Sequence, residues 1–126
     1  NIMIEYKVRV QDNGNKECRF NGKLHREDGP AIEKANGTKH WFINGERHRE
    51  DGPAIEKDNG TKHWFINGER HREDGPAVEF ANGKEWWING EQLTEDEFNN
   101  RNSVELTLEE ISKKFNIPLD KLRVNK

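Results

Sequence analysis

A 23-residue repeat constrains this chain more than any other feature of its sequence. Residues 21–43 read NGKLHREDGPAIEKANGTKHWFI, and residues 44–66 match them at 20 of 23 positions. Residues 67–88 form a third unit that is one residue shorter, and residues 1–20 and 89–96 look like partial units at the two ends. Self-similarity at a fixed period predicts small structural units that bury their apolar faces only by stacking on one another.

Glycine and proline mark the turns of each unit. Eight of the 11 glycines follow an asparagine, and the other three stand in Asp-Gly-Pro. Asn-Gly is the strongest short signal for a β-hairpin, because both residues tolerate positive φ. In the second unit and the start of the third we expect strands at Ala54–Lys57, Thr61–Ile66 and Glu69–Arg72. The expected fold class is mainly β, an antiparallel array of β-hairpins, with each Asp-Gly-Pro loop leading into the next unit.

Pairing across these turns predicts which side chains share a face. Across the three-residue turn, Lys57 is expected to face Thr61. The same register places Trp64 opposite Ala54, and pairing across the Asn-Gly turn places it opposite His71. A slip by one residue would exchange the two faces of every strand, so the register is a hypothesis. In this register the structural core comprises Trp41, Trp64, Trp86, Ile43, Ile66 and Ile88, and a second aromatic column on the opposite face comprises Phe42, Phe65 and Trp87.

The recurring run Trp-Phe-Ile-Asn-Gly-Glu-Arg-His at 64–71 resembles the MORN repeat, whose core reads aromatic-x-Asn-Gly-x-x-His. With His-Arg-Glu-Asp-Gly-Pro-Ala at 48–54, it is most similar to MORN-variant repeats of bacterial and phage proteins. The resemblance covers roughly residues 13–96, although Arg-Glu-Asp-Gly-Pro replaces the usual Gly-x-Gly after the histidine. It implies an elongated β-hairpin array that binds partners and acts as a scaffold. Similar repeats also occur in antitoxin-like bacterial proteins.

The sequence changes character after Leu93, where the glycine signals end. Residues 94–97 and 107–110 are capping-box patterns that predict the start of two helices. The second helix carries one apolar stripe and ends near Asn116. Its stripe comprises Leu108, Ile111 and Phe115, and short strands are expected beside it at Val104–Leu106 and Leu122–Val124. Residues 97–126 are therefore expected to form a small α/β cap that covers the open end of the sheet.

Two alternatives compete for this C-terminal segment. Residues 107–122 resemble the helix–turn–helix part of a LysM domain, a peptidoglycan-binding module, although no Gly-Asp precedes the threonine. A DNA-binding helix-turn-helix would need a longer second helix with more positive charge than Lys121, Arg123 and Lys126 supply. The cap that covers the sheet is the favoured interpretation.

Five histidines and three arginines recur with the period of the repeat. The histidines form two columns, His25, His48 and His71 in one, and His40 and His63 in the other. No metal site is expected, because these ligands come singly without close Cys/His pairs. Three strands per unit in a flat sheet would also hold equivalent residues roughly 14 Å apart.

The arginines stand in the Arg-Glu-Asp-Gly-Pro loops, next to Glu27, Glu50 and Glu73. Arginine interleaved with tryptophan could bind phosphates or stack on bases. Because acid matches base in every unit, a solvated ladder of ion pairs is the favoured interpretation. The candidate partner-binding residues are Arg26, Arg49, Arg72, Phe42, Phe65, Trp87, His40 and His63.

Composition bounds the class of protein. Charged residues make up 36% of the chain and hydrophobic residues 30%, with 21 basic against 24 acidic side chains. Such a polar chain lies near the disordered border, but a thin stacked sheet needs to bury only one or two side chains per strand. No apolar run suits a membrane span or a signal peptide, and the single Cys18 suits a reducing compartment. A cytoplasmic protein of a bacterial cell or a phage-infected host is expected.

No Ser/His/Asp or Cys/His set, phosphate loop or dinucleotide fingerprint is present, so we assign no catalytic residue, cofactor or metal ligand. The sequence favours a non-enzymatic scaffold that binds a protein partner through aromatic and arginine columns. One alternative is a phage or bacterial inhibitor, similar to an antitoxin, that blocks a host defence enzyme, nuclease or toxin. Binding of nucleotides or nucleic acid is a second alternative, which the balanced charge does not favour. The open edge of the sheet also permits a homodimer.

Overall fold

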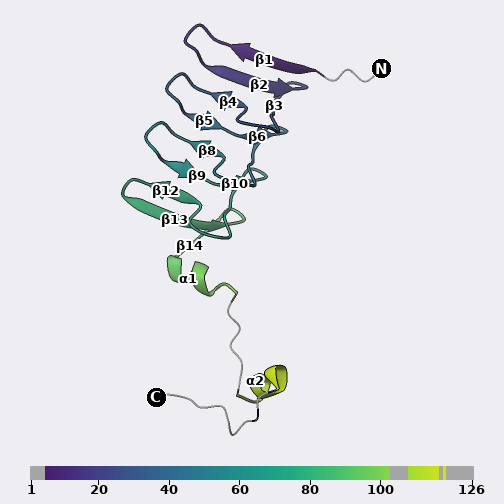
Figure 1. The fold of residues 1–126 in the computed structure, drawn as a ribbon, viewed down its shortest axis with the longest axis vertical. Coiled ribbons are helices and arrows are strands. Elements are labelled where there is room, and N and C mark those ends of the chain that lie inside the picture. The colour runs from purple at the N-terminus through teal and green to yellow at the C-terminus, as the bar shows by residue number, and fades with distance from the viewer. Residues whose placement is uncertain (1–4, 103–107, 117, 119–126) are drawn as a thin grey trace.

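A computed structural model describes residues 5–102, 108–116 and 118 of the chain. Within these residues the fold is mainly β, with hairpin-connected antiparallel strands and a small helical part toward the C-terminus, as the sequence predicts (Figure 1). The strands expected at Val104–Leu106 and Leu122–Val124 lie outside the described residues.

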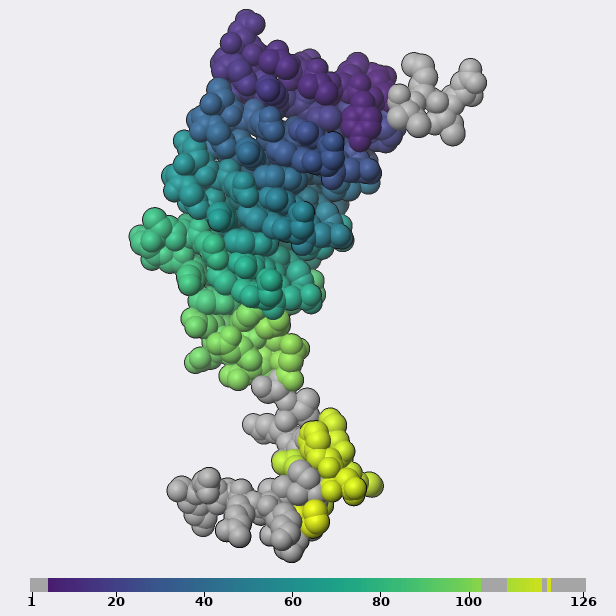
Figure 2. All heavy atoms as spheres, viewed as in Figure 1, coloured from purple at the N-terminus to yellow at the C-terminus, as the bar shows by residue number. Residues whose placement is uncertain are grey.

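One long antiparallel sheet runs through the repeats. In the described part of the chain its strand order is β1-β2-β4-β5-β8-β9-β12-β13-β14, with β3 paired to β2. Figure 2 shows the successive units as successive bands of one stack. The strands of the sheet are β1 (Tyr6–Val10), β2 (Lys16–Phe20), β3 (Lys23–Leu24), β4 (Ile32–Glu33), β5 (Lys39–His40), β8 (Ile55–Glu56), β9 (Lys62–His63), β12 (Val78–Phe80), β13 (Gly83–Ile88) and β14 (Glu91–Leu93).

The strand expected at Thr61–Ile66 is divided at Trp64. β9 ends before Trp64 and pairs within the long sheet, whereas β10 (Phe65–Ile66) follows it and pairs with β11 (Glu69–Arg70) in a separate side hairpin. The preceding unit divides in the same way, giving the side hairpin of β6 (Phe42–Ile43) and β7 (Glu46–Arg47). Each full unit therefore adds two strands to the main path of the long sheet. Equivalent residues of adjacent units are about 9.6 Å apart at ~4.8 Å per strand, which corrects the 14 Å expected from three strands.

Trp64 stays in backbone register although it belongs to neither strand. Its N–H donates to the Ala77 carbonyl oxygen of the next unit at 2.7 Å, and its carbonyl oxygen accepts the His71 N–H at 3.1 Å. The register expected across the turns is confirmed for Ile55 with His63 and for Phe65 with Arg70. Ala54, expected opposite Trp64, instead donates its N–H to the His63 carbonyl oxygen at 2.8 Å. Trp64 is thus the corner at which the chain leaves the long sheet for the side hairpin.

The Asn-Gly turns have the backbone that their sequence predicts. Asn67 has φ 50° and Gly68 has φ 82°, and two successive positive φ values define the type I′ hairpin turn. The one-residue deletion in the third unit shortens its first turn. Phe80 pairs there with Gly83, so Ala81 and Asn82 form the turn and Gly83 belongs to β13.

The most buried aromatic side chains of the repeats lie on the face opposite to the one expected, although Trp41 packs against the core cluster of Ala54, Ile55 and Phe65. Phe42 and Phe65 are each only 8% exposed, and Phe65 packs with Ala54 and Ile55. The chain bends at Trp64, so the rings of His63 and Phe65 on either side of it stack with centroids 6.4 Å apart. The residues expected as the core, Trp41, Trp64, Trp86, Ile43, Ile66 and Ile88, are all half-buried.

One helix closes the C-terminal end of the array. The capping box at Thr94 is confirmed: its hydroxyl oxygen accepts the Glu97 N–H at 3.1 Å, and the Glu97 carboxylate accepts the Thr94 N–H at 2.9 Å. α1 (Glu95–Asn100) contacts β13 and β14 and buries Phe98. α2 (Leu108–Phe115) is followed by Asn116 in the left-handed conformation, φ 55°, which is a common way for a helix to end. Among the described residues, α1 therefore supplies the cap.

Candidate partner-binding site

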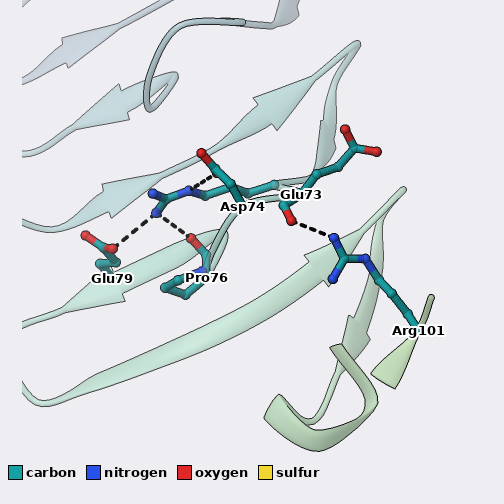
Figure 3. Close-up of polar contacts among 6 residues, drawn as sticks. Glu73, Asp74, Pro76, Glu79 and Arg101 are labelled. Carbon is teal, nitrogen blue, oxygen red and sulfur yellow. Dashed lines mark hydrogen bonds and ion pairs between the residues drawn. The ribbon is translucent and has the colours of Figure 1, made fainter. Parts of the chain in front are cut away.

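The arginine of each Arg-Glu-Asp-Gly-Pro loop is held by its own loop and by the strand that follows (Figure 3). Arg72 Nε donates to Asp74 Oδ1 at 2.8 Å, and Nη1 donates to the Pro76 carbonyl oxygen at 3.1 Å and to Glu79 Oε1 at 3.2 Å. The hydrogen bond from Arg72 lowers the pKa of the Asp74 carboxyl below its usual value. These contacts recur with Arg49 on Asp51, Pro53 and Glu56, and with Arg26 on Asp28, Pro30 and, at 3.9 Å, Glu33.

The same guanidinium groups link neighbouring units. Arg49 Cζ lies 3.9 Å from the ring centroid of Trp41, and Arg72 Cζ lies 4.0 Å from that of Trp64. Each arginine therefore stacks on the tryptophan of the preceding unit in a cation–π contact. Cys18 holds the equivalent position before Arg26, so the first unit lacks this contact.

The expected ladder of ion pairs is confirmed, but with different carboxylates. Its acids are the aspartate two residues after each arginine and the glutamate seven residues after it, rather than the adjacent glutamate. The sequence carries a signal for this choice, since both spacings recur in all three units. Arg26, Arg49 and Arg72, expected to contact a partner, each have Nε and Nη1 bonded within the array, and they line the grooves between successive loops.

Glycine in the Asp-Gly-Pro loop makes room for the guanidinium. A Cβ built on Gly52 would lie 3.0 Å from Arg49 Cζ, and Gly29 and Gly75 have the same relation to Arg26 and Arg72 at 2.9 and 3.0 Å. None of these glycines has positive φ. The sequence predicts a turn here, and the structure shows that close packing is the reason for the missing side chain.

We predict that Gly52→Ala destabilises the fold by about 1–3 kcal/mol, because the new methyl group displaces Arg49 from Asp51 and from Trp41. Urea unfolding measures this loss. In an Arg49→Ala background the same substitution should cost less than about 0.5 kcal/mol. Equal costs in both backgrounds would show that the guanidinium is not the reason for the glycine.

Successive loops enclose two grooves on one face of the array. The first, of about 790 Å³, lies between the loops at 26–30 and 48–51, and the second, of about 660 Å³, lies between the loops at 49–51 and 71–74. Trp41 and Ile43 line the first groove, and Trp64 and Ile66 line the second. Four of the six residues expected in the core therefore form the apolar lining of the grooves, whereas Trp86 and Ile88 line neither.

Carboxylates stand on the walls of both grooves. The adjacent glutamates that the arginines do not use, Glu27, Glu50 and Glu73, have side chains between 79% and 84% exposed. A histidine faces each of these glutamates, as His48 illustrates. Its Nδ1 accepts the Asn67 N–H at 3.0 Å, and its Nε2 lies 3.5 Å from Glu50 Oε1. In each groove two arginines stand against four carboxylates, a formal surplus of two negative charges with neutral histidine.

The remaining predicted site residues lie away from the grooves. Phe42, Phe65 and His63 are buried, which corrects their assignment to a partner surface, whereas His40 and Trp87 are half-buried and line neither groove. The physical reason is the bend of the chain, which encloses this face between the long sheet and the side hairpins. Burial, followed by the charge of Arg47, lowers the pKa of His40 to about 4. Burial, followed by Arg70, also lowers the pKa of His63.

A second cation–π ladder joins the side hairpins. Arg47 Cζ lies 5.3 Å from the ring centroid of Phe42 and 5.8 Å from that of Phe65, and Arg70 bridges Phe65 and Trp87 at 5.3 and 5.2 Å. The sequence analysis missed these arginines, although they recur directly after Asn-Gly-Glu. The ladder connects neighbouring units. The groove face is therefore the surface on which accessible charged groups lie beside partly exposed aromatic side chains.

Within residues 5–102, 108–116 and 118, no group of three or more His, Cys, Asp or Glu side chains is arranged to hold a metal ion. No helix of the described residues has the length and apolar character needed to cross a membrane. No protein-family description, curated protein or solved structure matches this chain.

Proposed function

We propose that this chain is a non-enzymatic, MORN-like repeat protein that binds a protein partner through its groove face. The observation that carries the proposal is the repetition of one groove, lined by half-buried tryptophan and isoleucine, between successive acidic loops. Tryptophan is enriched among the residues that dominate binding energy at protein interfaces. The ion-pair ladder supports the role, because it fixes the loops that form the groove walls.

Binding of nucleic acid is less well supported by the same residues. The guanidinium groups of Arg26, Arg49 and Arg72 already bond to carboxylates and carbonyl oxygens. A groove with surplus negative charge repels phosphate, whereas nucleic-acid binding depends on positive side chains that displace counterions.

A homodimer through the sheet edge would use β1, the first strand in the order of the sheet, where Val8 is 69% exposed. If Val8 faced Val8 of a second copy in an antiparallel pair, Lys7 would face Arg9. Like charges directly opposite each other destabilise a strand pair. The proposed function therefore relies on the groove face and not on this edge.

Photo-crosslinking tests the proposal. A benzoylphenylalanine at position 50, on the wall shared by both grooves, should give a protein adduct in cells that contain the natural partner. The matched control places the same group at Asp58, an exposed turn residue outside the groove lining. Adducts at position 58 but not at position 50 would contradict the proposed surface. Catalytic turnover by the purified chain would contradict the proposed class.

A further inference from the structure

The spacing of the grooves restricts the shape of a segment that could fill both of them. Equivalent residues of adjacent units are about 9.6 Å apart, because each unit adds two strands to the long sheet. A polyproline II helix has three residues per turn and rises ~3.1 Å per residue, so it advances about 9.3 Å per turn. Every third side chain of such a helix points the same way at nearly the spacing of the grooves.

An extended β-strand does not meet this condition. Its side chains alternate between two faces, so residues three apart point in opposite directions. In an α-helix only every seventh residue returns to the same face near this spacing, at about 10.5 Å for a rise of 1.5 Å per residue. Polyproline II matches the spacing more closely, at about 9.3 Å, and brings one side chain in three to each groove.

The chemistry of the groove favours a cationic side chain. The lining combines the indole of Trp41 or Trp64 with carboxylates on both walls. Glu50 lines both grooves, and its side chain is 84% exposed. The methylene stem of a lysine or arginine would cover the apolar lining, while its charged end would reach the carboxylates.

Resting on the proposed function, we propose that the groove face binds a basic segment of a partner protein in the polyproline II conformation. Lysine or arginine at every third residue would place one cation in each groove. Proline between the cations would lower the ordering cost, since it already holds the backbone near the polyproline II angles. The repeat of the receptor thus sets the repeat of its ligand.

Two synthetic peptides of identical composition test this match. The first is four repeats of Pro-Pro-Lys, and the second is two Lys-Lys pairs separated by six prolines and followed by two more, so that no two of its lysines lie three residues apart. Isothermal titration calorimetry at physiological salt should show the periodic peptide binding at least about ten-fold more tightly, because only it aligns its cations with the two grooves. Equal affinity for the two peptides, or no binding of either, would overturn the inference.

Charge-removing variants assign the binding to the grooves. Glu50→Gln should weaken the periodic peptide by about three- to ten-fold, because one carboxylate common to both grooves is lost. The matched control is Glu109→Gln on α2, an exposed carboxylate outside the groove lining, which should leave the affinity unchanged. Equal effects of the two variants would indicate general charge attraction and contradict groove binding. A crosslink at position 50 without periodic-peptide preference would refute this inference and leave the proposed function standing.

Discussion

Replacing Phe65 by alanine should lower the free energy of unfolding by about 3–5 kcal/mol, the loss typical of a large aromatic side chain removed from a core. Phe65 is 8% exposed and packs with Ala54 and Ile55 of its own unit. Its ring also lies 5.8 Å from Arg47 Cζ, which belongs to the preceding side hairpin. The substitution therefore leaves a cavity and removes a contact between neighbouring side hairpins.

A denaturant titration with matched controls tests this prediction. Phe80→Ala removes the same atoms from a side chain that is 40% exposed, and it should cost about 1 kcal/mol. Trp64→Ala should lower the free energy of unfolding less than Phe65→Ala, because Trp64 is only half-buried. Its side chain lines the groove, with one face of the ring on Arg72. A larger loss for Trp64→Ala would restore the tryptophan column as the core.

The contrast between Trp64 and Phe65 shows how far the sequence alone could go. Turn chemistry predicts the pairing, because Asn67 and Gly68 with positive φ leave little freedom of register. The mainly β fold and the pairing of Trp64 with His71 follow from that local rule, whereas the bond of Trp64 to Ala77 in place of Ala54 does not. Which face becomes buried does not follow, because both faces carry one aromatic residue per unit and alternation alone cannot rank them.

The missing information was the bend at Trp64. A strand of six residues was expected, but it breaks at Trp64 into β9 in the long sheet and β10 in the side hairpin, with His63 and Phe65 buried and Trp64 half-buried. Once the chain leaves the long sheet there, the spacing of the units also falls from three strands to two. The grooves depend on which face is buried and on the two-strand spacing of the units. The sequence therefore predicts the types of residue at the candidate site but not where the site lies.

For the arginine loops, the sequence predicts the ion pairs but not which carboxylates form them. Arg49, Asp51 and Glu56 recur at fixed spacing, and a column of ion pairs was the favoured interpretation of the repeat. The choice of acid depends on the path of the loop, which brings Asp51 and Glu56 to the guanidinium and turns Glu50 toward His48. Glu50 is therefore not used by Arg49 and stays exposed at the groove. The residue spacing alone does not predict this, because it depends on the geometry of the loop.

Acidification from about pH 6.5 to about pH 4 should destabilise the fold, and His40 is the main reason. Burial, followed by the charges of Arg47, Lys34, Lys57 and His63, lowers the pKa of His40 to about 4. In the unfolded chain its pKa returns to about 6.5. Between these values the unfolded state binds more protons than the folded state, so the free energy of unfolding falls as the pH decreases from about 6.5 to about 4.

Urea titrations at pH 7.5 and pH 4.5 measure the effect. We expect the free energy of unfolding of the wild type to fall by about 2 kcal/mol between these two pH values because of His40. This loss is smaller than the whole difference in pKa implies, because the ring is only partly buried. Asp28 and Asp74 have lowered pKa values and stay ionised in this range, so their ion pairs persist. His40→Phe removes the titrating group and should reduce the loss by that amount, because His40 Nδ1 has no hydrogen-bond partner to forfeit among the described residues. The same loss in both proteins would place the proton uptake elsewhere, with His63, whose pKa burial also lowers, as the next residue to replace.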